Sequence, residues 1–285
     1  MKLRKILVNS RNLIKHYPFS SIDYENEKRI SVDFSNNHAT YSNLIPDKCM
    51  LTWEDNSFGR RHKKSLKKQI SENRSFVFSF FDKFQRDSYM NDMWNDNDIL
   101  KIYKSTPYGP MQADIFRYCY LYNEGGFYID IGRKTPDLFN SYLSNDTQLV
   151  LFLQFYAHRD YTVANSEIYK KIPLQYIHAE FINSFFAAAP KSKFLEILIN
   201  NIVKYSRFYC NHEFHYPRDG ILSFTGPAMF KYSFFDYLQR YETQKIKFVE
   251  VDKLALKNSY LDGGESRWIK YPSYINSRNG KICNL

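Results

Sequence analysis

Several features that would assign this chain to a class at once are missing from its sequence. No run of about 18 or more consecutive apolar residues occurs, so no membrane-spanning helix is predicted. Residues 1–15 hold only short apolar runs broken by Lys and Arg, unlike the apolar region of a secretory signal. The four cysteines, Cys49, Cys119, Cys210 and Cys283, include no Cys-x-x-Cys pair. This spacing gives zinc ribbons and disulfide scaffolds little support and fits a reduced, cytoplasmic location for a soluble or at most peripheral protein.

Motifs for a zinc helix and for nucleic-acid recognition are also missing. His212 and His215 flank Glu213, but they lack the i, i+4 spacing of a zinc-binding helix. Lys and Arg number 40 against 30 Asp and Glu, which gives a net charge of +10. A basic surface suits nucleotide diphosphates, anionic lipid headgroups or nucleic acid. Because no recognition motif accompanies the charge, nucleic acid is the least favoured of these partners.

What is present indicates a globular α/β chain. Its 285 residues are 44% hydrophobic and 18% aromatic, which supports one sizeable core. Basic residues dominate the predicted helix at 60–70, where phosphate or anionic membrane binding competes with an ordinary solvated face. Asn and Asp capping signals in residues 91–103 precede another helix. The remaining periodic segments predict strands near 47–53, 76–80, 148–153, 177–189, 221–227 and 247–251 and helices at 194–202 and 230–238.

One stretch in the middle of the chain changes its hydrophobic period partway along. Over residues 111–123 apolar and aromatic side chains recur at helical spacing. Two glycines at 125–126 then end the helix, as glycine does where the backbone needs positive φ. Residues 127–131 alternate as a buried strand, and Asp130 comes at its carboxyl end. The pattern predicts a helix, a tight turn and a strand that delivers one carboxylate to the edge of a sheet.

Three charged residues of this stretch are candidate ligand-binding groups. Asp114 and Arg117 lie three residues apart on one helix face, one element before Asp130. In open α/β sheets, ligands bind beyond the carboxyl ends of the strands. A carboxylate for a divalent metal or hydroxyls, together with an Asp and Arg pair, suits a sugar that carries a diphosphate. The structural alternative is an ordinary i, i+3 ion pair and an aspartate that merely ends a strand.

Taken together, these residues carry a family resemblance. Asp114, Arg117, Tyr128 and Asp130, with the glycine pair between them, resemble the Asp-x-x-Arg and Gly-Gly-x-Tyr-x-Asp-x-Asp block of glycosyltransferase family 32, and are similar to the glucosylating domain of large clostridial toxins. The resemblance implies a GT-A (Rossmann-like) α/β fold with a mixed, mostly parallel sheet and helices on both faces. It also implies a nucleotide-sugar donor and Mn²⁺ or Mg²⁺. The sequence departs from the pattern at Gly132, which replaces the second acid.

The resemblance also implies roles for particular residues. Asp114 and Arg117 would bind donor-sugar hydroxyls and orient the leaving group, Asp130 would hold ribose or the metal, and Tyr128 would pack beside them. Trp53 ends the strand that begins near Pro46, and the corresponding Trp of the toxin domains stacks on the base, a contact that an indole suits well. The alternative for Trp53 is a half-buried core position.

A late segment resembles the loop that closes over the donor diphosphate in the toxin domains. There Glu265 would contribute to the metal site, while Ser266 and Trp268 would contact the phosphates. Asp262 is a competing metal ligand, and Arg267 or Lys270 would assist electrostatically. The alternative is a surface turn followed by a packing Trp.

Asn183, in a segment like Asn-x-Phe-x-Ala-x-x-Pro of the family, is a weaker site candidate whose alternative is capping or a backbone hydrogen bond.

The combined expectation is a single GT-A glycosyltransferase domain over residues 1–285. Its parts are a variable flank (1–43), a nucleotide-sugar-binding half (44–132) and an acceptor-side half with a C-terminal loop (133–285). The resemblance implies transfer, with retention, from a UDP- or GDP-sugar to a saccharide or lipid-linked oligosaccharide in bacterial capsule, O-antigen or lipopolysaccharide synthesis, with peripheral contact to the inner face of the plasma membrane. Because of Gly132, the alternative is a catalytically silent protein that binds carbohydrate or nucleotide.

Overall fold

A mixed six-stranded sheet forms the centre of the molecule. The computed structural model describes residues 44–58, 60–131, 139–154, 179–251 and 277–285. In spatial order the strands are β2 (Val77–Phe81), β1 (Lys48–Thr52), β3 (Gly126–Ile129), β5 (Glu180–Ala188), β4 (Leu149–Gln154) and β7 (Ile246–Glu250). Strands β2, β1 and β3 are parallel, as are β4 and β7, whereas β5 runs antiparallel to both of its neighbours. The parallel group brings the carboxyl ends of β1 and β3 together at one edge.

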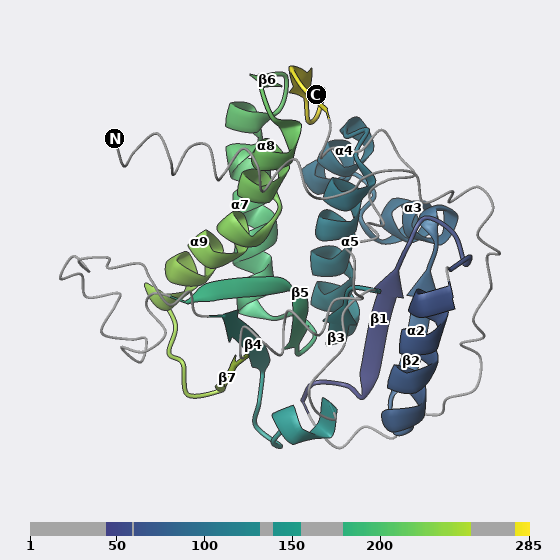
Figure 1. Cartoon of the computed structure of the whole chain (residues 1–285). Coiled ribbons are helices and arrows are strands. Elements are labelled where there is room, and N and C mark those ends of the chain that lie inside the picture. The colour runs from purple at the N-terminus through teal and green to yellow at the C-terminus, as the bar shows by residue number, and fades with distance from the viewer. Residues whose placement is uncertain (1–43, 59, 132–138, 155–178, 252–276) are drawn as a thin grey trace, which may run out of the picture.

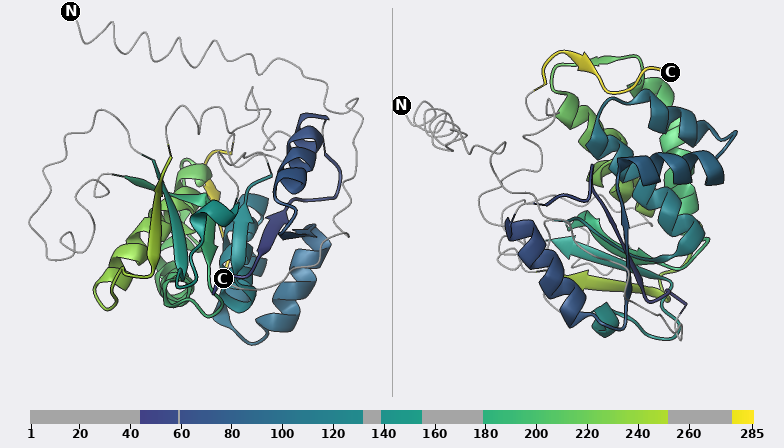
Figure 2. Two further views of the ribbon diagram at one scale, coloured as in Figure 1. Left: turned by 90° about the horizontal axis from the view of Figure 1, so that it is seen from below. Right: turned by 90° about the vertical axis from the view of Figure 1, so that its right-hand side faces the viewer.

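Helices cover both faces of this sheet (Figure 1). They are α2 (Arg60–Glu72), α3 (Lys83–Met93), α4 (Asp98–Ser105), α5 (Gly109–Glu124), α7 (Lys193–Tyr209), α8 (Pro217–Phe224) and α9 (Pro227–Leu238), with a 3₁₀ turn η1 (Phe139–Tyr142). Figure 2 shows α2 on the face opposite α5, α7 and α9. The predicted α/β class, with a mixed sheet and helices on both faces, is confirmed. Within the ranges that the structure covers, no helix has the length and apolar character to cross a membrane.

Alternate side chains of the strands enter two different cores, one on each face of the sheet. In β1, Met50 belongs to the core beneath α5 and α7, whereas Cys49 and Leu51 belong to the core beneath α2 and η1. In β3, Tyr128 and Phe127 divide in the same way. Alternate side chains of a strand point to opposite faces, so a strand buried on both sides reads as a continuous apolar run.

The glycine pair makes the junction between α5 and β3. Gly125 caps α5, its φ is 66°, and its N–H donates to the carbonyl of Leu121 at 2.9 Å. Gly126 has a φ of 101°, and a Cβ there would lie 2.8 Å from the carbonyl oxygen of Lys48. Only glycine meets both demands without strain. The chain therefore turns at once from helix to strand, and Asp130 follows the end of β3, where its N–H still donates to the Ser184 carbonyl of β5 at 2.9 Å.

Two secondary-structure expectations need correction. Residues 221–227 were expected as a strand, but 217–224 form α8, and Pro227 begins α9. The apolar run is too short to separate a strand from a helix by period, whereas Pro217 in the first turn is a helix-start signal. Helix α3 was not predicted, because its buried residues are Arg86 and Met90 rather than an apolar stripe. Its signal was the reciprocal capping box of Asp82 and Gln85.

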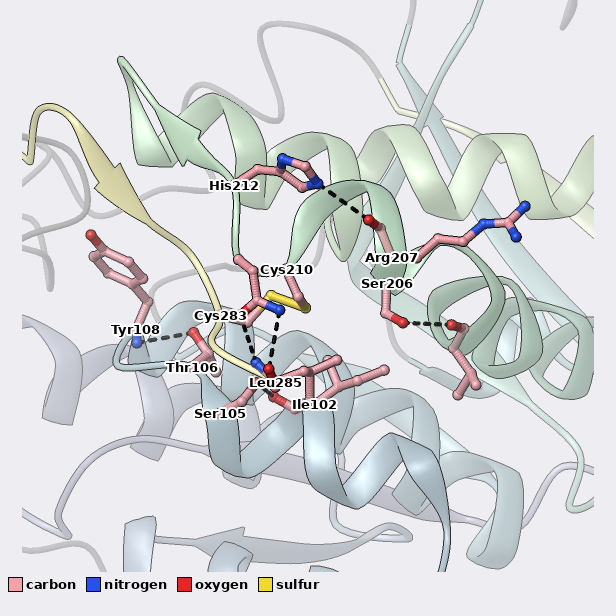
Figure 3. The surroundings of a disulfide bond; sticks show 12 residues. Ile102, Ser105, Thr106, Tyr108, Ser206, Arg207, Cys210, His212, Cys283 and Leu285 are labelled. Carbon is pink, nitrogen blue, oxygen red and sulfur yellow. Dashed lines mark hydrogen bonds between the residues drawn. A yellow bond between two sulfur atoms is a disulfide. The ribbon is translucent and has the colours of Figure 1, made fainter.

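The cysteine expectation is also wrong in part. Cys210, just after α7, is bonded to Cys283, with 4.7 Å between their Cα atoms (Figure 3). The bond holds β8 (Gly280–Lys281) close to β6 (Glu213–Phe214), with which it pairs. Cys49 and Cys119 are buried free thiols. Because stable disulfides belong to oxidising surroundings, the pairing removes the support that the cysteine spacing gave to a reduced location.

The disulfide predicts a stability that depends on reductant. It links residues 73 apart, and in the chain-entropy model closing such a loop stabilises a protein by about 4 kcal/mol. We expect dithiothreitol to lower the melting temperature of the wild type but not that of a Cys210→Ala, Cys283→Ala variant. Thiol titration of the denatured, unreduced wild type should find only Cys49 and Cys119 reactive. Reaction of all four cysteines without reductant would contradict the pairing.

Candidate functional site

Three charged side chains meet where β3 ends beside α5. On α5, Arg117 places Nη2 3.2 Å from Oδ1 of Asp114 and 3.5 Å from Oδ1 of Asp130. The side chains of Arg117 and Asp114 are only 6% and 10% exposed, whereas that of Asp130 is 28% exposed. The structure thus brings the three predicted charged residues into one cluster, in which Asp130 is the member most open to solvent.

Arg117 is held in place by two backbone carbonyls and an aromatic ring. Its Nε donates to the carbonyl of Ala113 at 3.2 Å, and its Nη1 donates to the carbonyl of Asn183 on β5 at 2.9 Å. Its guanidinium carbon lies 4.1 Å from the centre of the Tyr128 ring. A planar guanidinium suits such simultaneous stacking and forked bonding. Arg117 is therefore placed to hold the two carboxylates near each other without their full mutual repulsion.

Tyr128 fixes one oxygen of Asp130. Its hydroxyl donates to Oδ1 of Asp130 at 2.5 Å. Burial, with Asp130 close by, raises the pKa of Tyr128 well above its usual value, so the phenol stays protonated as a donor. Arg117 contacts the same Oδ1. The other carboxylate oxygen, Oδ2, is thus the atom of Asp130 best placed to accept a bond from a ligand.

Asp114 is clamped through both of its oxygens. The side-chain amide of Asn183 donates to Oδ1 at 3.2 Å, and the hydroxyl of Thr225 donates to Oδ2 at 3.1 Å. Burial raises the pKa of Asp114 to about 7, and nearby Asp130 adds to the rise, although Arg117 and these two hydrogen bonds oppose it. Asp114 therefore changes its charge near neutral pH.

This raised pKa predicts a pH-dependent stability. The folded value of about 7 lies above the ordinary, unfolded value of about 4. The stability that protonated Asp114 contributes is therefore fully present below about pH 4 and lost as the pH rises through about 7. We expect the free energy of unfolding of the wild type, relative to Asp114→Asn, to fall by up to about 3 kcal/mol between pH 5 and 8 in urea titrations. A constant difference would show that Asp114 is ionised throughout that range.

Trp53 lies just beyond the carboxyl end of β1, next to the strand that delivers Asp130. It is half-buried, and its ring centre is 5.9 Å from that of His62. The buried Arg86 holds this strand end, because its Nη1 donates to the Thr52 hydroxyl and to the Trp53 carbonyl, each at 2.8 Å. Its Nη2 also pairs with Glu54 at 3.1 Å. The role of Trp53 in base stacking stays a prediction.

The other predicted site residues lie outside the described residues. They are Gly132, Asp262, Glu265, Ser266, Arg267, Trp268 and Lys270. Among the residues that the structure does describe, no group of three or more His, Cys, Asp or Glu side chains could hold a metal ion. Asp130 nevertheless fits the kind of Mg²⁺ or Mn²⁺ site in which one protein carboxylate acts together with substrate phosphates.

Two residues of the cluster were not recognised from the sequence as parts of the site. Tyr118 looked like one more apolar position of a helix, and Thr225 looked like part of a strand that enters a turn. In the structure the Tyr118 hydroxyl donates to the Thr225 carbonyl at 2.8 Å. Asn183, the weaker candidate, does reach the cluster, and it contacts Asp114 and Tyr118. The spacing of Thr-Gly-Pro before a helix was the only local signal for Thr225.

Comparison with known proteins gives the cluster a context. Residues 31–147 match the family model of the glycosyltransferase sugar-binding region containing the DXD motif. Inositol phosphoceramide mannosyltransferase 1 of Schizosaccharomyces pombe is 27% identical over 199 residues, which are 68% of this chain and 52% of that protein. The chain thus spans about half the length of this curated relative. Among solved structures, the PaToxG glycosyltransferase has a TM-score of 0.47 and 15% identity, with coverage of 83% of this chain and 81% of that one.

Proposed function

We propose that this chain transfers a sugar from a nucleotide-sugar donor to a saccharide acceptor, because residues 31–147 match the family model of the glycosyltransferase sugar-binding region containing the DXD motif. The observation that carries the proposal is the meeting of Asp114, Arg117 and Asp130 at one strand end within the matched region. Ligands of open α/β sheets bind at such an edge. We also propose that residues 1–285 act as a single domain, since strands before and after residue 132 share one sheet.

The cluster suggests a division of work. The exposed Asp130 would hold a ribose hydroxyl or the divalent metal, which, when bound, offsets charge on the departing nucleoside diphosphate. Asp114 would accept bonds from the hydroxyls of the donor sugar. Arg117 would hold both carboxylates in place, and Trp53 would stack on the base.

The proposed donor and acceptor rest on one relative and on the sequence resemblance. A mannosyltransferase that acts on inositol phosphoceramide is among the relatives, which favours an acceptor sugar carried on a lipid, and a GDP- or UDP-sugar as donor. Helix α2 carries six Lys and Arg against one acidic residue, so it is the proposed contact with an anionic membrane surface. Retention and a role in bacterial surface polysaccharide are proposals that rest on the sequence resemblance, and the anomer of the purified product tests the first.

A thermal-shift screen tests the proposed function. Purified protein is heated with UDP-, GDP- and CMP-sugars, each with Mn²⁺ or with EDTA, as wild type and as Asp130→Ala. Ligand binding raises the melting temperature by mass action. We expect one donor to stabilise the wild type in Mn²⁺, and we expect the effect to be lost in the variant. Absence of any shift with every nucleotide sugar would overturn the transferase proposal.

The alternative function is that of a catalytically silent protein that binds carbohydrate or nucleotide. Gly132 favours it, because this glycine replaces the second acid of the motif. It predicts the same stabilisation by a nucleotide or sugar, with or without metal, but no release of nucleoside diphosphate with any acceptor. Equal stabilisation in Mn²⁺ and in EDTA, together with undetectable turnover, would favour this reading over the transferase.

A further inference from the structure

Thr225 connects the C-terminal helices to the candidate site. It lies between α8 and α9, 111 residues after Asp114, and is fully buried. Its hydroxyl donates to Oδ2 of Asp114 at 3.1 Å. Its carbonyl accepts the hydroxyl of Tyr118, one turn along α5, at 2.8 Å. Both polar atoms of Thr225 that can reach the site are therefore directed at α5.

These bonds close into a ring around the Asp114 carboxylate. Asn183 donates its side-chain amide both to Oδ1 of Asp114, at 3.2 Å, and to the hydroxyl of Tyr118, at 2.9 Å. Tyr118 in turn donates to the Thr225 carbonyl. Each of the two carboxylate oxygens thus receives a neutral donor from a different element, one from β5 and one from the α8–α9 junction. Such a ring fixes the rotation of a carboxylate, which a single ion pair does not.

We propose that Thr225 is a positioning residue that sets the orientation of the Asp114 carboxylate for the sugar of the donor. The inference rests on the proposed function of the cluster. Arg117 and Asn183 both contact Asp114 through Oδ1, and the two oxygens turn together about the terminal torsion, which is broad in carboxylates. Thr225 is the residue that holds Oδ2.

The alternatives open to the hydroxyl are limited. A threonine hydroxyl has one proton to donate, and its other neighbour is the Ile221 carbonyl at 3.4 Å, farther away than Asp114 at 3.1 Å. The β-branched side chain restricts χ1, so the hydroxyl has few other directions in a fully buried site. Loss of this hydroxyl leaves Oδ2 of the buried Asp114 without this donor, which changes how Asp114 meets a ligand.

A set of variants separates this role from simple packing. Thr225→Val keeps the shape and removes the donor, whereas Thr225→Ser keeps the donor. Ser233→Ala is the matched control, because Ser233 is another fully buried hydroxyl, on α9, and it contacts Asn201 at 3.1 Å. Calorimetry gives the Kd of the stabilising nucleotide sugar and of the same nucleoside diphosphate without its sugar. The ratio of the two Kd values reports contacts made to the sugar.

We expect Thr225→Val to weaken nucleotide-sugar binding about tenfold, as loss of a hydrogen bond to a charged group does, with an unchanged Kd for the nucleoside diphosphate. Thr225→Ser and Ser233→Ala should keep the wild-type ratio. An unchanged ratio in Thr225→Val, or an equal loss in Thr225→Ser, would overturn the inference alone. A wild type that binds no nucleotide sugar would overturn the proposed function with it. If Thr225→Val does not fold, Thr225→Cys, a weak donor of similar size, replaces it.

Discussion

Replacing Asp130 with asparagine should lower the rate of nucleoside diphosphate release by about 10²- to 10³-fold. The neutral amide is a poorer ligand for the divalent metal, and this metal would offset the negative charge that develops on the departing diphosphate. Asp130 is the charged residue of the cluster with the greatest exposure, at 28% of its side chain. The Tyr128 hydroxyl can still donate to the amide oxygen, so we expect the fold to be retained. Steady-state kinetics at saturating donor measure the effect.

Asp87 offers a matched control for this substitution. It also accepts a tyrosine hydroxyl, that of Tyr103 at 2.7 Å, and it pairs with a cation, Lys83, at 2.6 Å. Asp87 lies on α3 and Tyr103 on α4. Asp87→Asn should leave the rate of diphosphate release near that of the wild type. A wild-type rate in Asp130→Asn would remove Asp130 from the reaction, and an equal loss in both variants would indicate a general effect on folding.

Replacing Arg117 with methionine should destabilise the fold by about 3–5 kcal/mol, the cost of leaving a buried charge without its partner. The side chain of Asp114 is only 10% exposed and pairs with Arg117 at 3.2 Å. Removing the cation also lets the pKa of Asp114 rise further, since Arg117 is the main group that opposes the effect of burial, so the full loss is expected only where Asp114 of the wild type is ionised. Urea unfolding at about pH 9, above the wild-type pKa of Asp114, measures the loss.

A double variant distinguishes this mechanism from loss of packing alone. Asp114→Asn together with Arg117→Met removes the uncompensated charge, so it should recover part of the stability that the single Arg117→Met loses. Lys83→Met is the comparison for an exposed ion pair, since Lys83 and Asp87 are 50% and 36% exposed, and it should change stability by less than about 1 kcal/mol. Strict additivity of the two substitutions at 114 and 117 would contradict the charge-pair account.

Local sequence patterns were enough to predict the helix and the strand that carry the charged residues of the site. The helical period, the glycine pair and the short alternating strand predicted α5, its sharp end and β3, because these depend on residues close in sequence. The same patterns placed Asp114, Arg117 and Asp130 on elements that could face one edge. Their convergence with Asn183 and Thr225 could not be read in this way, since those residues lie 69 and 111 positions from Asp114 and their contacts depend on tertiary packing.

The failures have physical reasons of the same kind. Helix α3 buries an arginine on the side that faces β1, so its sequence lacks an apolar stripe. The disulfide joins residues 73 apart, and cysteine spacing carries no information on such a long-range pair. Hydrophobic period identifies an element by the face that it buries, and it fails where the buried face is polar or where the chain is joined across a distance.

We expect a nucleotide sugar to bind where Asp114, Arg117 and Asp130 meet. A crystal structure of the protein with Mn²⁺ and the nucleoside diphosphate of the stabilising donor tests this most directly. We expect the diphosphate beside Asp130 and the base against Trp53, with the Thr225 bond to Asp114 intact. A nucleotide bound at another edge of the sheet, with the cluster left unoccupied, would contradict it.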